Sequence, residues 1–441
     1  MDGQLLVRVY NVGCGDCILV RVPDTDRDYH FLIDCGNCSA DKWAPLGRAM
    51  EDVCRELTQG RGAPDDGTRR LDLLVATHKH WDHLKGFESE HDTFKQMQID
   101  RIWLTVGMDE RHPEARELRG LQAYTRQSVE SLQRMGLELS AGLDTLLMNS
   151  IGTVTSAAVV CETLPREVGT KPLYVYRGFE EGLSADVKES QLFRFRDPSI
   201  KLRVLAPEKD IDGAYMGRAR ALLQGLSEHG RHVSRWAGRG QVDEWPVNMS
   251  KSDFRRLRER MMYTSLAAAV AEGHAINNTS VVLLLEWCGR RLLFSGDAEW
   301  TPGAVEGAKE GSWEVMWANE SVKTDLAKPL DFLKVAHHGS RNATPWNLDD
   351  PDDSVNEILD TILPRAAAGS APTARAVVST CAGKIPAKGN PVPKPELMQE
   401  LGRRVANCCS YPDELFPQPR RTDLEALPQI DVPFDPAEGY A

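Results

Sequence analysis

The sequence predicts a protein of the α/β class, on three observations. Short runs rich in β-branched and apolar residues recur along its 441 residues, as expected of buried strands. Segments with helical spacing of apolar residues alternate with several of these runs, which is the pattern of α/β folds. Hydrophobic residues make up 41% of the chain, which is typical of globular proteins. We therefore expect an ordered core rather than a disordered chain.

The strand candidates follow one another from residue 5 to residue 380. The first three runs, LLVRVYNVG, CILVRVP and YHFLID, predict a β-meander, and the near-continuous apolar run LDLLVAT at 71–77 predicts a strand covered on both faces. Helices are expected over 49–57 and over 113–135, where Gly136 ends the helical spacing. The later strand candidates are IDRIWLTVG, SIKLRVLAP, NTSVVLLLEW, RRLLFSGD, LKVAHHGS and ARAVVST.

Irregular stretches interrupt this pattern between about 110 and 270, and we interpret them as insertions. Residues 140–198 mix Gly, Pro and Ser with strand-like runs, TVTSAAVVCETL and PLYVYRGF. Residues 209–273 are rich in Arg and contain an amphipathic helix candidate, and Trp236 and Trp245 make the region a candidate docking surface for a protein partner. We expect one domain over 1–406, and a Pro-rich tail over 407–441 that wraps the surface or is partly disordered.

Composition limits the classes of function. The net charge of −12 argues against a general nucleic-acid coat protein, because sequence-independent binding depends on Lys and Arg. The N-terminal MDGQLLVRVYNVG lacks the features of a secretory signal, and no run of about 18 apolar residues follows, so we expect a cytoplasmic protein without a membrane span. The ten cysteines are then expected to be reduced.

Ligand-capable side chains concentrate in THKHWDHLKG at 77–86. The segment places His78, His80, Asp82 and His83 within six positions, so three of the 11 histidines fall there. Because it follows a predicted buried strand, the loop can turn all four side chains inward. The two His separated by one residue can bind one transition-metal or zinc ion, and the Asp-His pair can bind a second. The segment therefore predicts a metal site.

Two distant fragments end predicted strands in a similar way. SGDAE places Asp297 after one apolar run, and AHHGS places His337 and His338 after another. Each fragment alone is a weak signal, because strand-end carboxylates often cap turns and strand-end histidines are often surface residues. Since the same-side ends of strands converge in an α/β sandwich, these residues can join the first cluster.

The order HKHWDH, SGD, AHHGS resembles the metallo-β-lactamase fold, an αββα sandwich. The longer strings NVGCGDCILV, FLIDCG, INNTSVVLLLEWCGRRLLFSGDAE and FLKVAHHGS resemble the metallo-β-lactamase domain of ComEC-type bacterial DNA-uptake proteins. The resemblance covers about 1–110, 199–208 and 274–384. Because these motifs occur here without a transmembrane channel, the uptake role itself does not carry over.

The resemblance implies a site for two divalent ions, Zn²⁺ or Mn²⁺. The implied ligands are His78 and His80 at the first ion, Asp82 and His83 at the second, Asp297 between the two, and either His337 or His338 at the second ion. The sequence does not choose between the last two. Asp34 would orient the ligand loop from below, and Asp16 would lie near the same rim.

Two departures from the family pattern bear on this site. Many metallo-β-lactamase enzymes have a further His before the bridging Asp, whereas this chain reads NNTS there, as ComEC-like sequences do, and only His274 is near. The last family strand usually leads to a His-Pro loop, whereas this chain has STCAGKIPAKGNPVP. The first ion would then lack a third protein His, and a substrate contact from that loop would be missing.

The cysteines allow a second metal hypothesis. Two CxxC pairs, Cys14 with Cys17 and Cys35 with Cys38, have the spacing of a structural zinc site. In the resembling proteins, Cys at the positions of Cys17 and Cys35 acts as a small apolar residue. A structural zinc ion and simple packing both remain open.

The site predicts a metal-dependent hydrolase that uses a metal-bound hydroxide, with Asp82, Asp297 and His338 as the residues carrying catalysis. The resemblance points to phosphodiesters, and hence to a phosphodiesterase or nuclease acting on nucleic acid or a nucleotide. The expected phosphate contacts are Ser340, Arg341 and Asn278. The alternatives are a hydrolase of small esters, lactones or thioesters, and a non-catalytic partner subunit with a metal-stabilised core.

Overall fold

The computed structural model describes residues 3–37, 46–115, 118–120, 122–123, 125–126, 153–179, 192–217, 270–301, 311–367, 369–379, 392–408 and 429–438. Several features of the sequence lie outside the described residues. They are most of the helix expected over 113–135, the amphipathic helix expected within 209–273, Trp236, Trp245, Cys38 and most of the tail.

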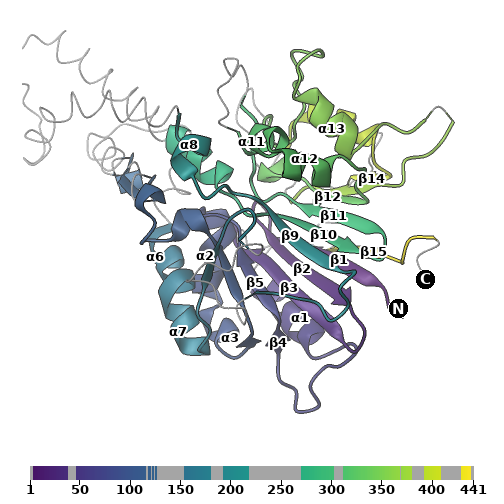
Figure 1. Ribbon diagram of the computed structural model, residues 1–441. Helices are drawn as coiled ribbons and strands as arrows, with labels where there is room; N and C mark the ends of the chain where they lie inside the picture. The colour runs from purple at the N-terminus through teal and green to yellow at the C-terminus, as the bar shows by residue number, and fades with distance from the viewer. Residues whose placement is uncertain are drawn as a thin grey trace, which may run out of the picture.

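Two sheets face each other in the described part of the molecule (Figure 1). The first sheet has the strand order β15 (Gln429–Phe434), β1 (Leu5–Tyr10), β2 (Cys17–Pro23), β3 (Asp28–Cys35), β5 (Leu73–Ala76), β7 (Ile102–Thr105) and β8 (Leu173–Val175). Its first four strands are antiparallel neighbours, and β3, β5, β7 and β8 are parallel.

The second sheet has the order β14 (Asn407–Cys408), β13 (Arg375–Val377), β12 (Phe332–Lys334), β11 (Arg290–Phe294), β10 (Val282–Trp287) and β9 (Lys201–Ala206). Strands β11 to β14 are parallel, and β10 is antiparallel to both of its neighbours. A small parallel pair joins β4 (Arg70–Leu71) to β6 (Gln98–Ile99).

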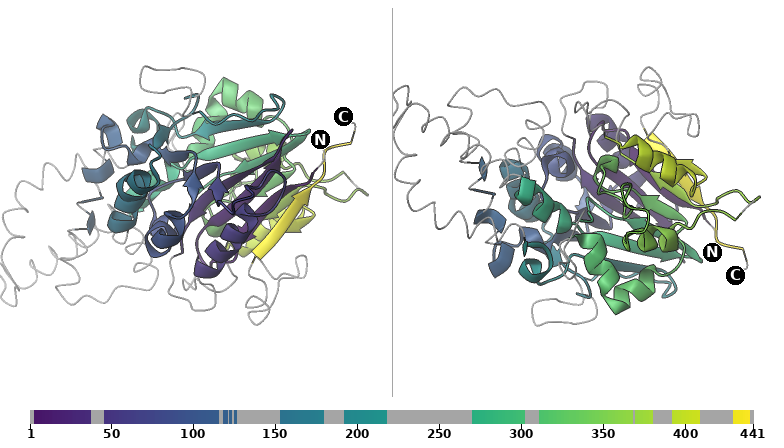
Figure 2. Two further views of the ribbon diagram at one scale, coloured as in Figure 1. Left: turned by 90° about the horizontal axis from the view of Figure 1, so that it is seen from below. Right: turned by 90° about the horizontal axis from the view of Figure 1, so that it is seen from above.

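Three apolar clusters define the layers. The central cluster joins the inner faces of both sheets, with Val7 and Phe31 from the first sheet against Leu283 and Phe332 from the second. Helices cover the two outer faces of the sandwich, which the two views turned by 90° from Figure 1 also show (Figure 2). On the first sheet lie α1 (Leu46–Leu57), α2 (Trp81–Ser89), α3 (His91–Phe94), α6 (Thr153–Ala158) and α7 (Leu164–Val168). On the second lie α11 (Ser312–Ala318), α12 (Glu320–Leu326), α13 (Asn356–Ile362) and α14 (Pro395–Gly402).

A smaller apolar cluster adjoins the ligand-bearing end of the sheets. It contains α8 (Ile211–Tyr215), the short 3₁₀ helix η1 (Val106–Met108) and the residues before β10, including Ile276. The α/β class that the sequence predicts is confirmed by this alternation of strands and helices.

One segment differs from its sequence-based interpretation. The run TVTSAAVVCETL was interpreted as strand-like, but it forms α6 and the π-helical turn η2 (Val159–Thr163) that leads into α7. Ala157, Val160 and Leu164 are buried at helical spacing and pack in the same cluster as Leu84 and Phe87. Tertiary packing on α2 therefore overrides the β preference of its valines and threonines.

The C-terminal segment also does more than wrap the surface. Within the expected tail, β15 pairs with the whole of β1, from Leu5 opposite Phe434 to Tyr10 opposite Gln429. Val432 and Phe434 point into the central cluster. The alternation of apolar residues in QIDVPF is short, and the prolines around it mask the strand signal in the sequence.

Candidate metal centre

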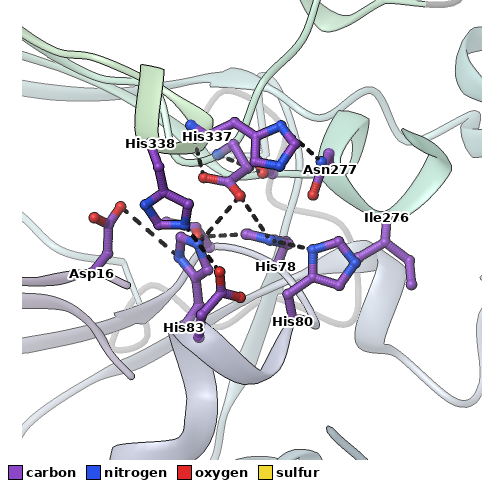
Figure 3. A network of polar contacts seen from close by, with 12 residues as sticks. Asp16, His78, His80, His83, Ile276, Asn277, His337 and His338 are labelled. Carbon is purple, nitrogen blue, oxygen red and sulfur yellow. Dashed lines mark hydrogen bonds and ion pairs between the residues drawn. The ribbon is translucent and has the colours of Figure 1, made fainter. Parts of the chain in front are cut away.

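Strand ends from both sheets bring the predicted ligands to one edge of the sandwich. The loop after β5 carries His78 to His83, the loop after β11 carries Asp297, and the turn η4 (His337–Gly339) follows β12. Figure 3 shows the imidazoles of His78, His83 and His338 converging on one point. Ligating atoms lie within 4.8 Å of one another in four groups: His78, His80 and Asp297; His83, Asp297 and His338; Cys14, Asp82 and His338; and Asp16, Asp34 and His83.

The first candidate position uses the two histidines separated by one residue. His78 Nε2 lies 3.0 Å from His80 Nδ1 and 3.6 Å from Asp297 Oδ2. Burial lowers the pKa of His78 well below its ordinary value and lowers the pKa of His80 to about 4. Both imidazoles are therefore neutral at pH 7, and neutral imidazole is the form that binds a metal ion.

The second candidate position combines both sheets. His338 Nε2 lies 2.9 Å from Asp82 Oδ2, and His83 Nε2 lies 3.3 Å from Asp297 Oδ2. Burial opposes protonation of His83, but the charges of Asp297 and Asp34 outweigh it and raise the pKa of His83 well above its usual value. His83 is thus cationic when no metal ion is bound, and a metal ion would displace its proton.

The structure distinguishes the two adjacent histidines of AHHGS. The ring of His338 belongs to two of the four groups, whereas that of His337 belongs to none. His337 instead donates its backbone N–H to Asp297 Oδ1 over 3.0 Å. Both residues and Gly339 have positive φ, at 41°, 51° and 74°. This left-handed turn sends the two neighbouring rings in different directions, and such strained backbone is typical of functional sites.

Asp34 holds the ligand loop from behind. Its carboxylate accepts hydrogen bonds from the backbone N–H of Thr77 at 2.7 Å and from Thr77 Oγ1 at 2.6 Å, and it lies 2.7 Å from His83 Nδ1. The contact with His83 Nδ1 fixes the His83 ring with Nε2 toward the candidate metal position. Asp34 has a positive φ of 55°, so its backbone is also strained.

Asp16 lies farther from His83 Nδ1 than Asp34 does, and it pairs with a buried lysine. Lys334 Nζ donates to Asp16 Oδ2 over 2.8 Å, and Ser379 Oγ hydrogen-bonds to Asp16 Oδ1. Lys334 is fully buried, although it ends an apolar strand. Sequence reasoning missed both partners. A lysine inside the otherwise apolar run FLKVA was the available signal, because a buried lysine needs a partner.

A second polar network that sequence reasoning missed surrounds His337. The buried carboxylate of Glu299 lies 2.7 Å from His337 Nδ1, accepts from Asn277 Nδ2 at 2.8 Å and contacts His274 Nδ1. Burial opposes ionisation of Glu299, but His274 and His337 outweigh it and lower its pKa to about 2. His274, the nearest histidine before the bridging Asp, is therefore engaged by Glu299 in the structure. The signal was the Glu two residues after Asp297 in SGDAE.

The three expected phosphate contacts have different surroundings. The side-chain carbonyl of Asn278 accepts from the backbone N–H groups of Glu299 at 3.2 Å and Ser312 at 2.9 Å, so it fixes the chain around the site. Arg341 forms an ion pair with Asp349. Ser340 Oγ lies 3.1 Å from His337 Nδ1. Of the three residues, Ser340 is the one whose side chain contacts a histidine beside the candidate metal positions.

The cysteines separate into two environments. Cys17 and Cys35 are opposite each other on β2 and β3 and lie in the apolar cluster under α1, where Cys35 Sγ is 3.7 Å from Met50 Sδ. Cys14 lies instead beside Asp82 and His338. Cys38 is outside the described residues. Packing accounts for Cys17 and Cys35, and the described part of the chain contains no group that joins them to Cys14.

The donor set fits divalent cations. Buried imidazole nitrogens and carboxylate oxygens are the usual ligands of zinc and manganese. In the described part of the chain, Asp82 Oδ1 is buried without a hydrogen-bond partner, which is costly unless a cation binds it. Buried His, Asp and Cys groups of this structure can therefore hold a metal ion.

Comparison with known protein families and curated proteins identified no relative of this chain. No model of a known protein family matches the chain, and no curated protein matches it. None of the described helices has both the length and the apolar composition that crossing a membrane requires.

Proposed function

We propose that this chain is a metal-dependent hydrolase of the metallo-β-lactamase fold, related to the ComEC-type domains, and that it cleaves phosphodiesters in nucleic acid or nucleotides. The observation that carries the proposal is the convergence of the three His/Asp groups at the strand ends of both sheets, with ligating atoms within 4.8 Å in each group. Two sheets packed face to face with helices outside agree with the αββα arrangement of that family.

The chain's own residues would divide the work. His78, His80 and Asp297 would hold one ion. His83, His338 and Asp297 would hold the other, with Asp82, 2.9 Å from His338 Nε2, as a further ligand. Two divalent ions so held lower the pKa of water and neutralise negative charge that develops on a phosphoryl oxygen. Asp34 keeps His83 in its ligating orientation.

His337 and Ser340 would contact the substrate. His337 lies next to the cluster, with Nδ1 held by Glu299 and its side chain 31% exposed. In the metal-free chain, the hydrogen bond with Glu299 and the charge of Asp297 raise the pKa of His337 to about 9, although burial opposes this. An imidazole that carries a proton beside the metal positions would bind an anionic phosphodiester more strongly than a neutral ester.

The test combines metal content with cleavage. We expect wild-type protein to bind about two equivalents of Zn²⁺ or Mn²⁺ per chain, as a two-metal hydrolase requires, and to cleave single-stranded DNA, RNA or bis(p-nitrophenyl) phosphate. Asp297→Ala should lose both the metal ions and the cleavage. Asp66→Ala, the same change at an exposed carboxylate between α1 and β4, is the matched control and should keep both.

Other outcomes separate the alternatives. Metal binding with hydrolysis of lactones or thioesters, and no cleavage of phosphodiesters, would redirect the proposal to small-molecule substrates. Metal binding without cleavage of any of these esters would favour the partner subunit with a metal-stabilised core. Wild-type protein without bound metal would contradict the hydrolase.

A further inference from the structure

A thiol lies at the second candidate metal position. Cys14 is 6% exposed, and its Sγ belongs to a group with Asp82 and His338 in which the ligating atoms lie within 4.8 Å of one another. Ligands of one tetrahedral zinc ion are separated by roughly 3.3 to 3.8 Å, given bond lengths of about 2.0 to 2.3 Å. A small adjustment of these side chains would therefore allow all three residues to bind one ion.

The backbone holds Cys14 in this place. The turn between β1 and β2 is docked directly on the ligand loop, because the N–H of Asp16 donates to the carbonyl of Asp82 over 3.2 Å. The N–H of Gly36 donates in turn to the carbonyl of Asp16 over 2.9 Å. A Cβ atom at Gly15 would lie only 2.3 Å from the carbonyl oxygen of Gly36 and 2.7 Å from that of Asp82. Only glycine permits this approach, which places the preceding thiol beside Asp82.

The carboxylate of Asp82 gives an independent indication. Its side chain is almost fully buried, and Oδ2 is 2.9 Å from His338 Nε2, while Oδ1 has no hydrogen-bond partner. Burying an oxygen in this way costs free energy that a cation would recover. Asp82 therefore has a coordination site unused by the protein, next to both Cys14 and His338.

We propose that Cys14 Sγ is a ligand of the second metal ion, together with Asp82 and His338. This inference rests on the proposed metal centre and adds to it a sulfur ligand supplied by the β1–β2 turn. Binding would convert the thiol to a thiolate and release one proton to solvent. The two positions then differ in chemistry, because the first has only nitrogen and oxygen donors.

The difference predicts a metal preference for each position. Thiolate is a soft ligand that selects zinc over manganese, whereas imidazole and carboxylate accept either ion. We expect the second position to take Zn²⁺ or its spectroscopic substitute Co²⁺ first, and the first position to accept Mn²⁺ as well. A mixed Zn/Mn centre would follow when both ions are supplied.

The experiment is a titration of the metal-free full-length chain with Co²⁺, followed by absorption spectroscopy. A thiolate ligand gives an intense near-ultraviolet charge-transfer band that nitrogen and oxygen ligands do not give. We expect the band in wild-type protein and its loss in Cys14→Ser, which should still bind Co²⁺ and should bind Zn²⁺ at least about tenfold more weakly, since even indirect ligand changes cost that much. Cys54→Ser, a change of equal chemistry at a buried site on α1 (8% exposed), should keep the band.

The outcomes separate this inference from the proposed function. Wild-type protein that binds Co²⁺ without the band, or a Cys14→Ser variant that keeps the band, overturns the thiolate ligand while the metal centre stands. Wild-type protein that binds no Co²⁺ overturns both. If Cys14→Ser fails to fold, the X-ray absorption spectrum of zinc-loaded wild-type protein decides, because a sulfur scatterer at about 2.3 Å is required by the inference and its absence contradicts it.

Discussion

Two networks of buried charge in this molecule are built from different cations. In the first, Arg8 on β1 lies 2.7 Å from Asp52 and 2.8 Å from Glu56 on α1, and 2.6 Å from Asp431 on β15. In the candidate metal centre, Asp82 and Asp297 contact imidazoles instead. A guanidinium never loses its proton, whereas an imidazole does so near neutral pH. The cation of the first network is therefore permanently charged, whereas the imidazoles of the second can exchange protons for a metal ion.

The difference between the two networks shows which buried carboxylates are candidates for a functional role. Arg8 and Tyr10 donate hydrogen bonds to Asp52 Oδ2, and Arg55 forms an ion pair with Asp52 Oδ1, so both oxygens of this carboxylate have partners. Asp82 Oδ1 has no hydrogen-bond partner. The pKa of Asp82 lies well below its usual value, because the hydrogen bond with His338 and the charges of His83 and His338 together outweigh burial. A buried carboxylate that is ionised and only half satisfied is therefore a candidate ligand for a cation.

The largest effect is expected from a ligand of the metal centre. His80→Ala should reduce phosphodiester cleavage at least about 10³-fold, because a metal ion contributes several kcal/mol to transition-state stabilisation and each 1.36 kcal/mol is about tenfold in rate. The free energy of unfolding of the metal-free protein should change little by comparison, since the pKa of His80 is about 4 and the ring carries no charge at pH 7. Cleavage assays and urea unfolding measure the two effects. A rate close to that of wild type would remove His80 from the metal site.

The opposite pattern is expected from the arginine network. Arg8→Met leaves Asp52 and Glu56 without their buried cation, and should lower the free energy of unfolding by about 3 kcal/mol. Metal content of the folded protein should stay at the wild-type value. Arg196→Met, at an exposed ion pair with Asp26, is the control and should change stability by less than about 1 kcal/mol. Metal loss in Arg8→Met would show that the two networks are coupled.

Much of the fold was visible in the sequence because strands of a two-layered sandwich are buried along their whole length. The runs that form β2, β3 and β5 are nearly continuous in apolar residues, and their boundaries were predicted closely. The β15 strand and the helical α6 segment were not predicted. Both owe their conformation to a partner distant in the sequence, β1 in one case and α2 in the other.

One part of the candidate site was likewise predictable from the sequence, and another part was not. The predicted ligands His78, His80, Asp82 and His83 are contiguous, so their proximity follows from the sequence alone. The residues around them are not contiguous. Lys334 beside Asp16 and Glu299 beside His337 depend on how two sheets meet, which no local pattern encodes. Cys14 was predicted as half of a CxxC pair, but the β1–β2 turn places it beside Asp82 instead.

A smaller effect is expected when a residue behind the ligands is changed. Asp34→Asn keeps the volume of the side chain but weakens its hold on His83 Nδ1, and should lower metal affinity about 10- to 100-fold. Competition with a chelating dye measures the affinity. Asp72→Asn is a matched control, since Asp72 is equally buried but pairs with Arg27 away from the site. Equal affinities in Asp34→Asn and wild type would reduce Asp34 to a purely structural residue.

The smallest effect is expected at Glu299, which holds His337 rather than a metal ligand. Glu299→Gln should lower the pKa of His337 from about 9 by about one unit or more, because it removes a hydrogen-bonded carboxylate. Proton NMR of the metal-free protein measures this pKa, and Glu320→Gln on the exposed start of α12 is the control. An unchanged pKa would assign the shift to Asp297, the other carboxylate near His337.

The same pair predicts a pH window for stability. A raised pKa means that His337 binds its proton more tightly in the folded chain, so its contribution is complete below pH 6.5 and is lost as the pH rises through about 9. The lowered pKa of Glu299 gives a contribution that is complete above pH 4.5 and is lost as the pH falls toward about 2. Wild-type and Glu299→Gln proteins should therefore differ most in free energy of unfolding between pH 4.5 and 6.5, and should approach each other by pH 9.5. Urea unfolding at pH 6 and pH 9.5 measures the difference, and an equal gap at both values would mean that Glu299 stabilises the chain through contacts that do not involve the charge of His337.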